Sequence, residues 1–168
     1  WKPAPSSFSA IVDFESSESH FFLNPRASEQ DKSILSLVEL PSLPGHIWLT
    51  SSGTTQKTEI KLIALSKNAF LVAAAASNRH LGIEPDDVWY KNLPDFHVGG
   101  LSILARAHLA KTKVIDDYAN NIRWEAKSFV ARVNEVRATL ISLVPTQVYD
   151  LVHAGLKAPA HIRAILVG

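Results

Sequence analysis

Apolar and polar residues alternate along residues 46–168 in a pattern that predicts strands interleaved with helices. Short apolar runs typical of strands occur at 88–93, 112–115, 139–144 and 162–167. Segments with helical periodicity lie at 66–81, 99–111, 124–137 and 146–154. Strands that alternate with helices in this way predict an α/β fold, with a doubly wound, mostly parallel sheet and flanking helices.

Local boundary signals support these elements. Ser66 can cap the first helix, and Gly82 stands where a glycine commonly ends one. Pro145 should end the strand at 139–144, because proline cannot donate a ladder hydrogen bond. Proline and the threonine after it are natural first-turn residues, so the helix at 146–154 should begin close to Pro145.

Residues 1–45 are less regular and rich in serine and proline. We interpret them as an irregular segment of the same domain, with an antiparallel strand pair at 10–14 and 20–23. Residues 46–168 then form the α/β domain. A last strand that stops at Gly168 predicts a domain truncated at its C-terminal end. Its uncovered sheet edge should favour self-association into homo-oligomers.

Composition excludes several classes of function. The net charge of +1 provides no electrostatic basis for binding nucleic acid. The absence of cysteine excludes disulfides, thiolate metal sites and cysteine nucleophiles, and is compatible with a cytoplasmic location. No apolar run approaches the ~20 residues of a membrane helix. The seven histidines lack metal-ligand spacing, so we predict no metal site formed by the protein itself. Tryptophans expected in the core are Trp48, Trp89 and Trp124.

A hydroxyl-rich segment, Thr-Ser-Ser-Gly-Thr-Thr-Gln-Lys at 50–57, follows a strand-like run at 46–49 and precedes another at 60–65. Its backbone N–H groups and hydroxyls could surround one phosphate without a helix N-terminus. The alternative is an ordinary solvated turn.

Two further segments follow predicted strands, at the sheet edge where such folds bind ligands. Leu-Pro-Asp-Phe-His-Val-Gly-Gly-Leu occupies 93–101, where a histidine next to two glycines could contact a ligand closely. Alternatively, this histidine caps the following helix. Ser-Leu-Val-Pro-Thr-Gln occupies 142–147 and could equally be a helix start. We expect these two segments and the hydroxyl-rich segment to lie at the same end of one sheet.

Together the three segments resemble the adenylate-forming acyl-CoA synthetase (AMP-binding) family. The family phosphate loop, Ser-Gly-Thr-Thr-Gly-x-Pro-Lys, is similar to residues 52–55 followed by Lys61. The Leu-Pro-x-Phe-His-x-x-Gly-Leu signature corresponds to 93–101, and Val-Pro-Thr to 144–146. The sequences of these motifs are most similar to those of the o-succinylbenzoate–CoA ligases of menaquinone biosynthesis. The resemblance covers residues 47–168, which would be an N-terminal fragment of such an enzyme. It implies that the α/β domain at 46–168 binds the nucleotide and the acyl group.

The resemblance implies a ligase that activates a carboxylic acid with ATP and Mg²⁺ and transfers the acyl group to coenzyme A. The implied phosphate-binding residues are Ser51, Ser52, Gly53, Thr54, Thr55 and Lys61. The implied acyl- and substrate-binding residues are Phe96, His97, Gly99, Gly100, Thr146 and Gln147. The catalytic residues of the family, together with its adenine-binding segment, would lie beyond residue 168. The 168-residue chain is therefore expected to be inactive by itself.

Four departures from the family pattern leave alternatives open. Gln56 replaces the second loop glycine, the loop proline is missing, and the loop is about two residues longer, which should make it a poorer phosphate cradle. Asp95 replaces an apolar residue before Phe96. The alternatives are a ligase for a fatty, aryl or amino acid, and a family member that binds a ligand without catalysis.

Overall fold

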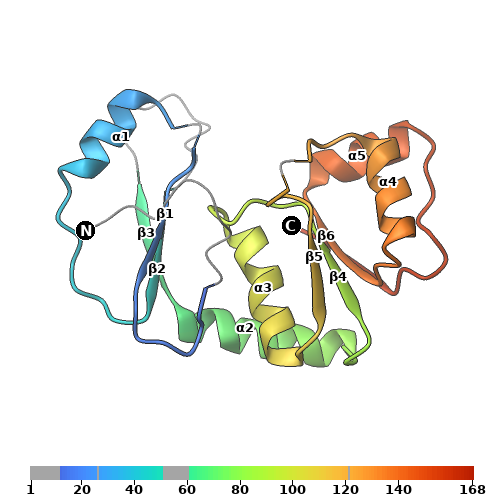
Figure 1. Ribbon diagram of the computed structural model, residues 1–168, viewed down its shortest axis with the longest axis horizontal. Coiled ribbons are helices and arrows are strands. Elements are labelled where there is room, and N and C mark those ends of the chain that lie inside the picture. Colours follow the sequence, from blue (N-terminus) through green and yellow to red (C-terminus); the bar gives the residue numbers. More distant parts are fainter. Residues whose placement is uncertain (1–11, 26, 51–60, 121) are drawn as a thin grey trace. The chain divides into compact units, whose positions relative to one another are not determined.

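The structure is a computed structural model that describes residues 12–25, 27–50, 61–120 and 122–168. The chain divides into two compact units, Trp1–Phe70 and Leu71–Gly168. Figure 1 colours both along the sequence.

The first unit contains a three-stranded sheet in the order β1-β2-β3. Its strands are β1 (His20–Phe22), β2 (His46–Thr50) and β3 (Leu62–Ser66), and the helix α1 spans Glu29–Ser36. β1 is parallel to β2, whereas β3 is antiparallel to it. The prediction that 10–14 and 20–23 form an antiparallel pair is wrong. The second segment does contain a strand, β1, but this strand pairs with β2. The described part of 10–14 is not a strand: Val12 and Phe14 are buried side chains outside any strand.

The second unit contains the predicted parallel sheet, with strand order β5-β4-β6-β7. The strands are β4 (Val88–Lys91), β5 (Lys113–Asp116), β6 (Leu140–Leu143) and β7 (Ala164–Val167). The helices are α2 (Lys67–Leu81), which crosses the boundary between the units, α3 (Val98–Ala110), α4 (Ala126–Glu135) and α5 (Pro145–His153). Every strand pair in this sheet is parallel. The α/β fold with a parallel sheet and flanking helices is thereby confirmed.

The two faces of this sheet pack against different helices. Alternate residues of a strand point to opposite faces, so Trp89 and Leu140 join a core with Ile103 of α3. Tyr90 and Ile141 join a second core with Phe129 of α4. Figure 1 accordingly shows α3 on one side of the sheet, with α4 and α5 on the other.

The predicted helix boundaries hold where a local signal exists. α2 ends at Leu81, and Gly82 has φ = 56°, the left-handed conformation that glycine adopts without strain. Pro145 is the first residue of α5. It needs no N–H partner there, because the first helical N–H groups have none within the helix.

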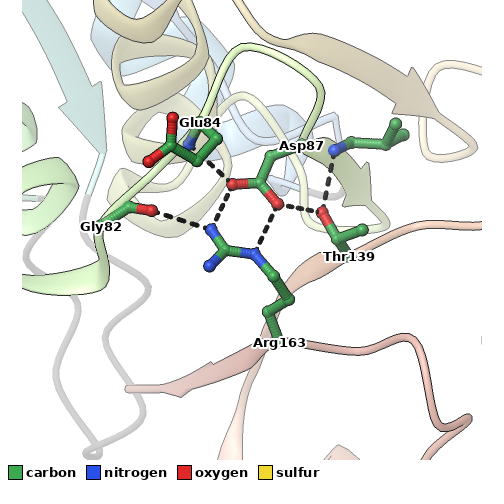
Figure 2. Close-up of polar contacts among 6 residues, drawn as sticks. Gly82, Glu84, Asp87, Thr139 and Arg163 are labelled. Atoms are coloured by element: carbon green, nitrogen blue, oxygen red, sulfur yellow. Dashed lines mark hydrogen bonds and ion pairs between the residues drawn. The ribbon is translucent and has the colours of Figure 1, made fainter.

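An ion pair joins the amino ends of the parallel strands. Asp87 lies just before β4 and is buried, and both of its carboxylate oxygens accept hydrogen bonds from Arg163, which precedes β7. Thr139, just before β6, donates to Asp87 at 2.6 Å, and the Glu84 N–H donates at 2.9 Å (Figure 2). Although burial opposes ionisation, these bonds lower the pKa of Asp87 from 3.8 to about 2.

Within the described part of the chain, no helix is long and apolar enough to cross a membrane.

Candidate ligand site at the carboxyl edge of the parallel sheet

The segments that follow β4 and β6 meet at the carboxyl edge of the parallel sheet. The two strands are neighbours, with Trp89 opposite Leu140 and Tyr90 opposite Ile141. The chain leaves β4 toward α3 and leaves β6 toward α5, which cover opposite faces of the sheet (Figure 1). Such a divergence between neighbouring strands is the switch point at which doubly wound folds bind ligands. The predicted segments 93–101 and 142–147 are therefore brought together.

His97 is the residue immediately before α3, and its side chain makes no capping hydrogen bond to the helix. The alternative in which this side chain caps α3 is thus not supported. The ring packs against Phe96, with centroids 4.7 Å apart. Burial lowers the pKa of His97 below its ordinary value of 6.5, because the charged imidazolium loses hydration. The imidazole is therefore mainly uncharged at neutral pH, with one nitrogen that donates and one that accepts a hydrogen bond.

The two glycines after His97 have different surroundings. Gly100 is buried, and a Cβ atom at its position would lie 2.2 Å from the carbonyl oxygen of Pro94. Its lack of a side chain is therefore needed for α3 to pack against the preceding turn. Gly99 is exposed, and a Cβ there would meet only the Leu93 Cδ1 atom, at 3.2 Å. Gly99 is thus the glycine whose backbone a ligand could approach.

The two predicted residues of α5 also differ. Thr146 is exposed in the first turn of the helix. Gln147 is buried, and its side-chain oxygen accepts a hydrogen bond from the Val144 N–H at 3.0 Å. Part of the hydrogen-bonding capacity of Gln147 is therefore used to begin α5, which leaves Thr146 as the more accessible group.

A cluster of charges that the sequence analysis did not identify lies at the same edge. Lys91, the last residue of β4, is fully buried, and its Nζ atom lies 2.9 Å from Asp95 and 2.8 Å from Asp116. Burial raises the pKa of Asp95, and the Lys91 ammonium opposes that rise. Two features of the sequence could have signalled this cluster: a lysine inside an apolar strand, and Asp95 at a position that is apolar in the family.

On the α4 side of the sheet, a small polar cavity of about 30 Å³ adjoins Asn92, Asp117 and Arg132. Both side-chain amide atoms of Asn92 are buried and lack a hydrogen-bond partner among the described residues. Asp117 is held by Tyr90 at 2.7 Å and Arg132 at 3.0 Å. A cavity of this size accommodates about one water molecule, which could bond to Asn92.

The strands on either side of the hydroxyl-rich segment belong to a different sheet from the strands that precede the other two segments. The hydroxyl-rich segment connects β2 to β3 of the three-stranded sheet, so the prediction of three segments at one end of one sheet is wrong. The reason is that β3 returns antiparallel to β2 and never joins the parallel sheet. The residues predicted to bind phosphate at 51–55 lie outside the described residues, whereas Lys61 is exposed immediately before β3.

Another cavity lies within the first unit, with a volume of about 1060 Å³. It is lined mainly by residues 35–44, together with Phe21, Trp48 and Leu62. No predicted site residue that the structure describes contributes to it. Among the described residues, no group of three or more His, Asp or Glu side chains could hold a metal ion.

Comparisons with known proteins identify similar enzymes, although no protein-family model matches the chain. The 2-succinylbenzoate–CoA ligase of Staphylococcus epidermidis is 30% identical over 120 residues, which cover 70% of this chain and 24% of that enzyme. The o-succinylbenzoate CoA synthetase of Bacillus subtilis, solved with its acyl-adenylate intermediate, has a TM-score of 0.63 and 30% identity. The same enzyme in complex with ATP and magnesium gives a TM-score of 0.62. Both structural matches cover 73% of this chain and 24% of the synthetase.

The chain thus spans about a quarter of the length of the relatives it matches. Over that part, sequence and fold agree with each other, because both comparisons find o-succinylbenzoate–CoA ligases. The chain is therefore homologous to part of the adenylate-forming acid–CoA ligases, and the o-succinylbenzoate–CoA ligases are among the members to which it is similar.

Proposed function

We propose that this chain is part of an ATP-dependent acid–CoA ligase whose acid is o-succinylbenzoate. The observation that carries the proposal is the meeting of the segments at 93–101 and 142–147 at the switch point of the parallel sheet. The similarity to o-succinylbenzoate CoA synthetase, whose solved structure contains the acyl-adenylate of that acid, supports the choice of substrate.

The proposed reaction has two steps. The carboxylate oxygen of the acid attacks the α-phosphorus of ATP, and the bond to the bridging oxygen breaks, which releases pyrophosphate and leaves an acyl-adenylate. The sulfur of coenzyme A then attacks the acyl carbon, loses its proton and displaces AMP to form the thioester. Such phosphoryl chemistry depends chiefly on positioning and on stabilising negative charge.

The carboxyl edge offers groups suited to the acid and the α-phosphate. The N-terminus of α3 has no side-chain cap, so its first backbone N–H groups can donate to an anion. An uncharged His97 can donate one further hydrogen bond to a carboxylate or phosphate oxygen. Phe96 and the exposed Gly99 would border the acyl group, with Thr146 on the opposite rim. Gln147 would line the same rim through its side-chain amide nitrogen, because its side-chain oxygen already accepts a hydrogen bond at the start of α5.

The phosphate end of the nucleotide is assigned to the hydroxyl-rich segment. On this proposal the residues that hold the β- and γ-phosphates are Ser51, Ser52, Gly53, Thr54 and Thr55. Lys61 would add a positive charge from the exposed position before β3. Mg²⁺ would enter with ATP, as the two occur together in one structure of the Bacillus subtilis enzyme.

The experiment is carboxylate-dependent ATP–pyrophosphate exchange by the complete gene product, over a panel of fatty, aryl and amino acids that includes o-succinylbenzoate. Exchange with o-succinylbenzoate alone is expected. Exchange with another acid would support the assignment as an acid–CoA ligase and reject o-succinylbenzoate as its substrate. No exchange with any acid, from folded protein, would reject the enzyme and favour the ligand-binding alternative.

A pair of variants tests the site itself. His97→Gln should lower kcat/KM for the acid about tenfold or more, because a positioned hydrogen bond is lost. The control is His80→Gln, at an exposed position of α2, which should leave the exchange rate unchanged. Equal rates for the two variants would contradict the assignment of His97.

A further inference from the structure

Lys91 occupies an unusual place for a charged side chain. It is the last residue of β4, where its neighbours along the strand are the buried Trp89 and Tyr90, and its own side chain has no exposed surface. Removing an ammonium from water costs several kcal/mol, and partners in good geometry only offset that cost. A buried lysine of this kind is therefore weak evidence for a role in stability.

The two carboxylates that hold Lys91 come from different segments. Asp95 belongs to the turn between β4 and α3, and Asp116 is the last residue of β5. Backbone hydrogen bonds also connect Lys91 to the end of β5. The Lys91 carbonyl accepts from the N–H groups of Asp117 at 3.0 Å and Tyr118 at 3.3 Å. Lys91 thus ties the turn that precedes His97 to the end of the neighbouring strand.

A row of rings leads from Lys91 to His97. The Lys91 Nζ atom lies 5.6 Å from the centre of the Tyr118 ring, a cation–π distance. Tyr118 meets Phe96 edge to face at 6.1 Å, and Phe96 packs on His97 at 4.7 Å. The His97 side chain makes no capping bond to α3, so the contact with Phe96 is an interaction that can position the imidazole.

We propose that Lys91 is a positioning residue for His97. The ion cluster of Lys91, Asp95 and Asp116 holds the turn 92–97 in place. The packed rings of Tyr118 and Phe96 then fix the position of the His97 imidazole at the carboxyl edge. Lys91 does not touch the substrate. Its effect on binding the acid rests on the proposed function, whereas its effect on His97 does not.

The direct test is NMR of the 168-residue chain, which contains seven histidines. The His97 imidazole signal is assigned by its loss in His97→Gln. Lys91→Met removes the ammonium but retains most of the aliphatic side chain. It should shift the His97 signal and change the pKa obtained by titrating that signal. The matched control is Lys113→Met, at an exposed position of β5, which should change neither.

A second variant covers the case in which Lys91→Met does not fold. Asp95 is partly exposed, with 20% of its side chain accessible, so Asp95→Asn weakens the cluster without leaving a fully buried group unpaired. It should shift the His97 signal in the same direction. An unchanged His97 signal and pKa in a folded Lys91→Met variant, or in folded Asp95→Asn if the former does not fold, would overturn the proposal.

Kinetics of the complete gene product separate this inference from the proposed function. Lys91→Met should raise KM for the acid about tenfold and alter KM for ATP much less, since only the imidazole is displaced. Absence of exchange in the unmodified protein, together with a shifted His97 signal, would reject the ligase and retain the positioning role. A normal KM for the acid in Lys91→Met together with an unchanged His97 signal would reject the positioning role and retain the ligase. A normal KM together with a shifted His97 signal would retain the positioning role and reject the contact of His97 with the acid.

Discussion

The Asp87–Arg163 ion pair should make the stability of residues 71–168 depend on pH. Asp87 is 3% exposed and accepts hydrogen bonds from Arg163, Thr139 and the Glu84 N–H (Figure 2). In the folded chain its pKa is about 2, against an ordinary value of 3.8. At 1.36 kcal/mol per unit of pKa, this interval corresponds to about 2.5 kcal/mol of stability near neutral pH.

The sign follows from which state binds the proton. Above about pH 5 the carboxylate is ionised in both states, so the whole contribution is present. As the pH falls through 3.8 the unfolded chain takes up the proton first, and the contribution is lost progressively down to about pH 2. Asp87→Asn should therefore lower the free energy of unfolding by about 2–3 kcal/mol at neutral pH and by progressively less in acid. Arg163 retains 43% exposure, so it stays hydrated when its partner is removed.

The assay is urea denaturation of the 168-residue chain across this pH range, followed through the NMR amide signals of β4 and β6. The control is Asp86→Asn, which removes the same charge from an exposed position one residue earlier and should cost less than about 0.5 kcal/mol. A loss for Asp87→Asn that is the same at neutral pH and at pH 3 would refute the electrostatic reasoning.

Two further substitutions test the packing at the carboxyl edge. Gly100→Ala should lower the free energy of unfolding by about 2 kcal/mol or more, seen as a lower melting temperature, because its Cβ would overlap the Pro94 carbonyl. Gly99→Ala should cost less, because its Cβ would meet only a movable side chain. Equal losses for the two variants would contradict this explanation. Gln147→Leu should cost about 1–2 kcal/mol in urea denaturation, because the Val144 N–H loses its acceptor; an unchanged midpoint would show that water replaces the amide.

Local sequence signals were sufficient for most elements of the second unit. The apolar run before Pro145 became β6, and the glycine at residue 82 ended α2 in the left-handed conformation. These features depend on residues close together in the chain, so periodicity and capping chemistry are enough to find them. The same signals were insufficient in the first unit, where the partner of β1 is the distant β2.

The candidate site divides in the same way. The sequence by itself determined which segments bear suitable chemistry, because the residues before α3 and α5 are contiguous motifs that also identify the family resemblance. Only the tertiary structure decided that β4 and β6 are neighbours, that Gly100 is needed for packing, and that Lys91 meets Asp116 from another strand. Pairing between strands and the burial of a charge depend on residues far apart in the chain. No local pattern specifies them, since their energies arise only when the sheet has formed.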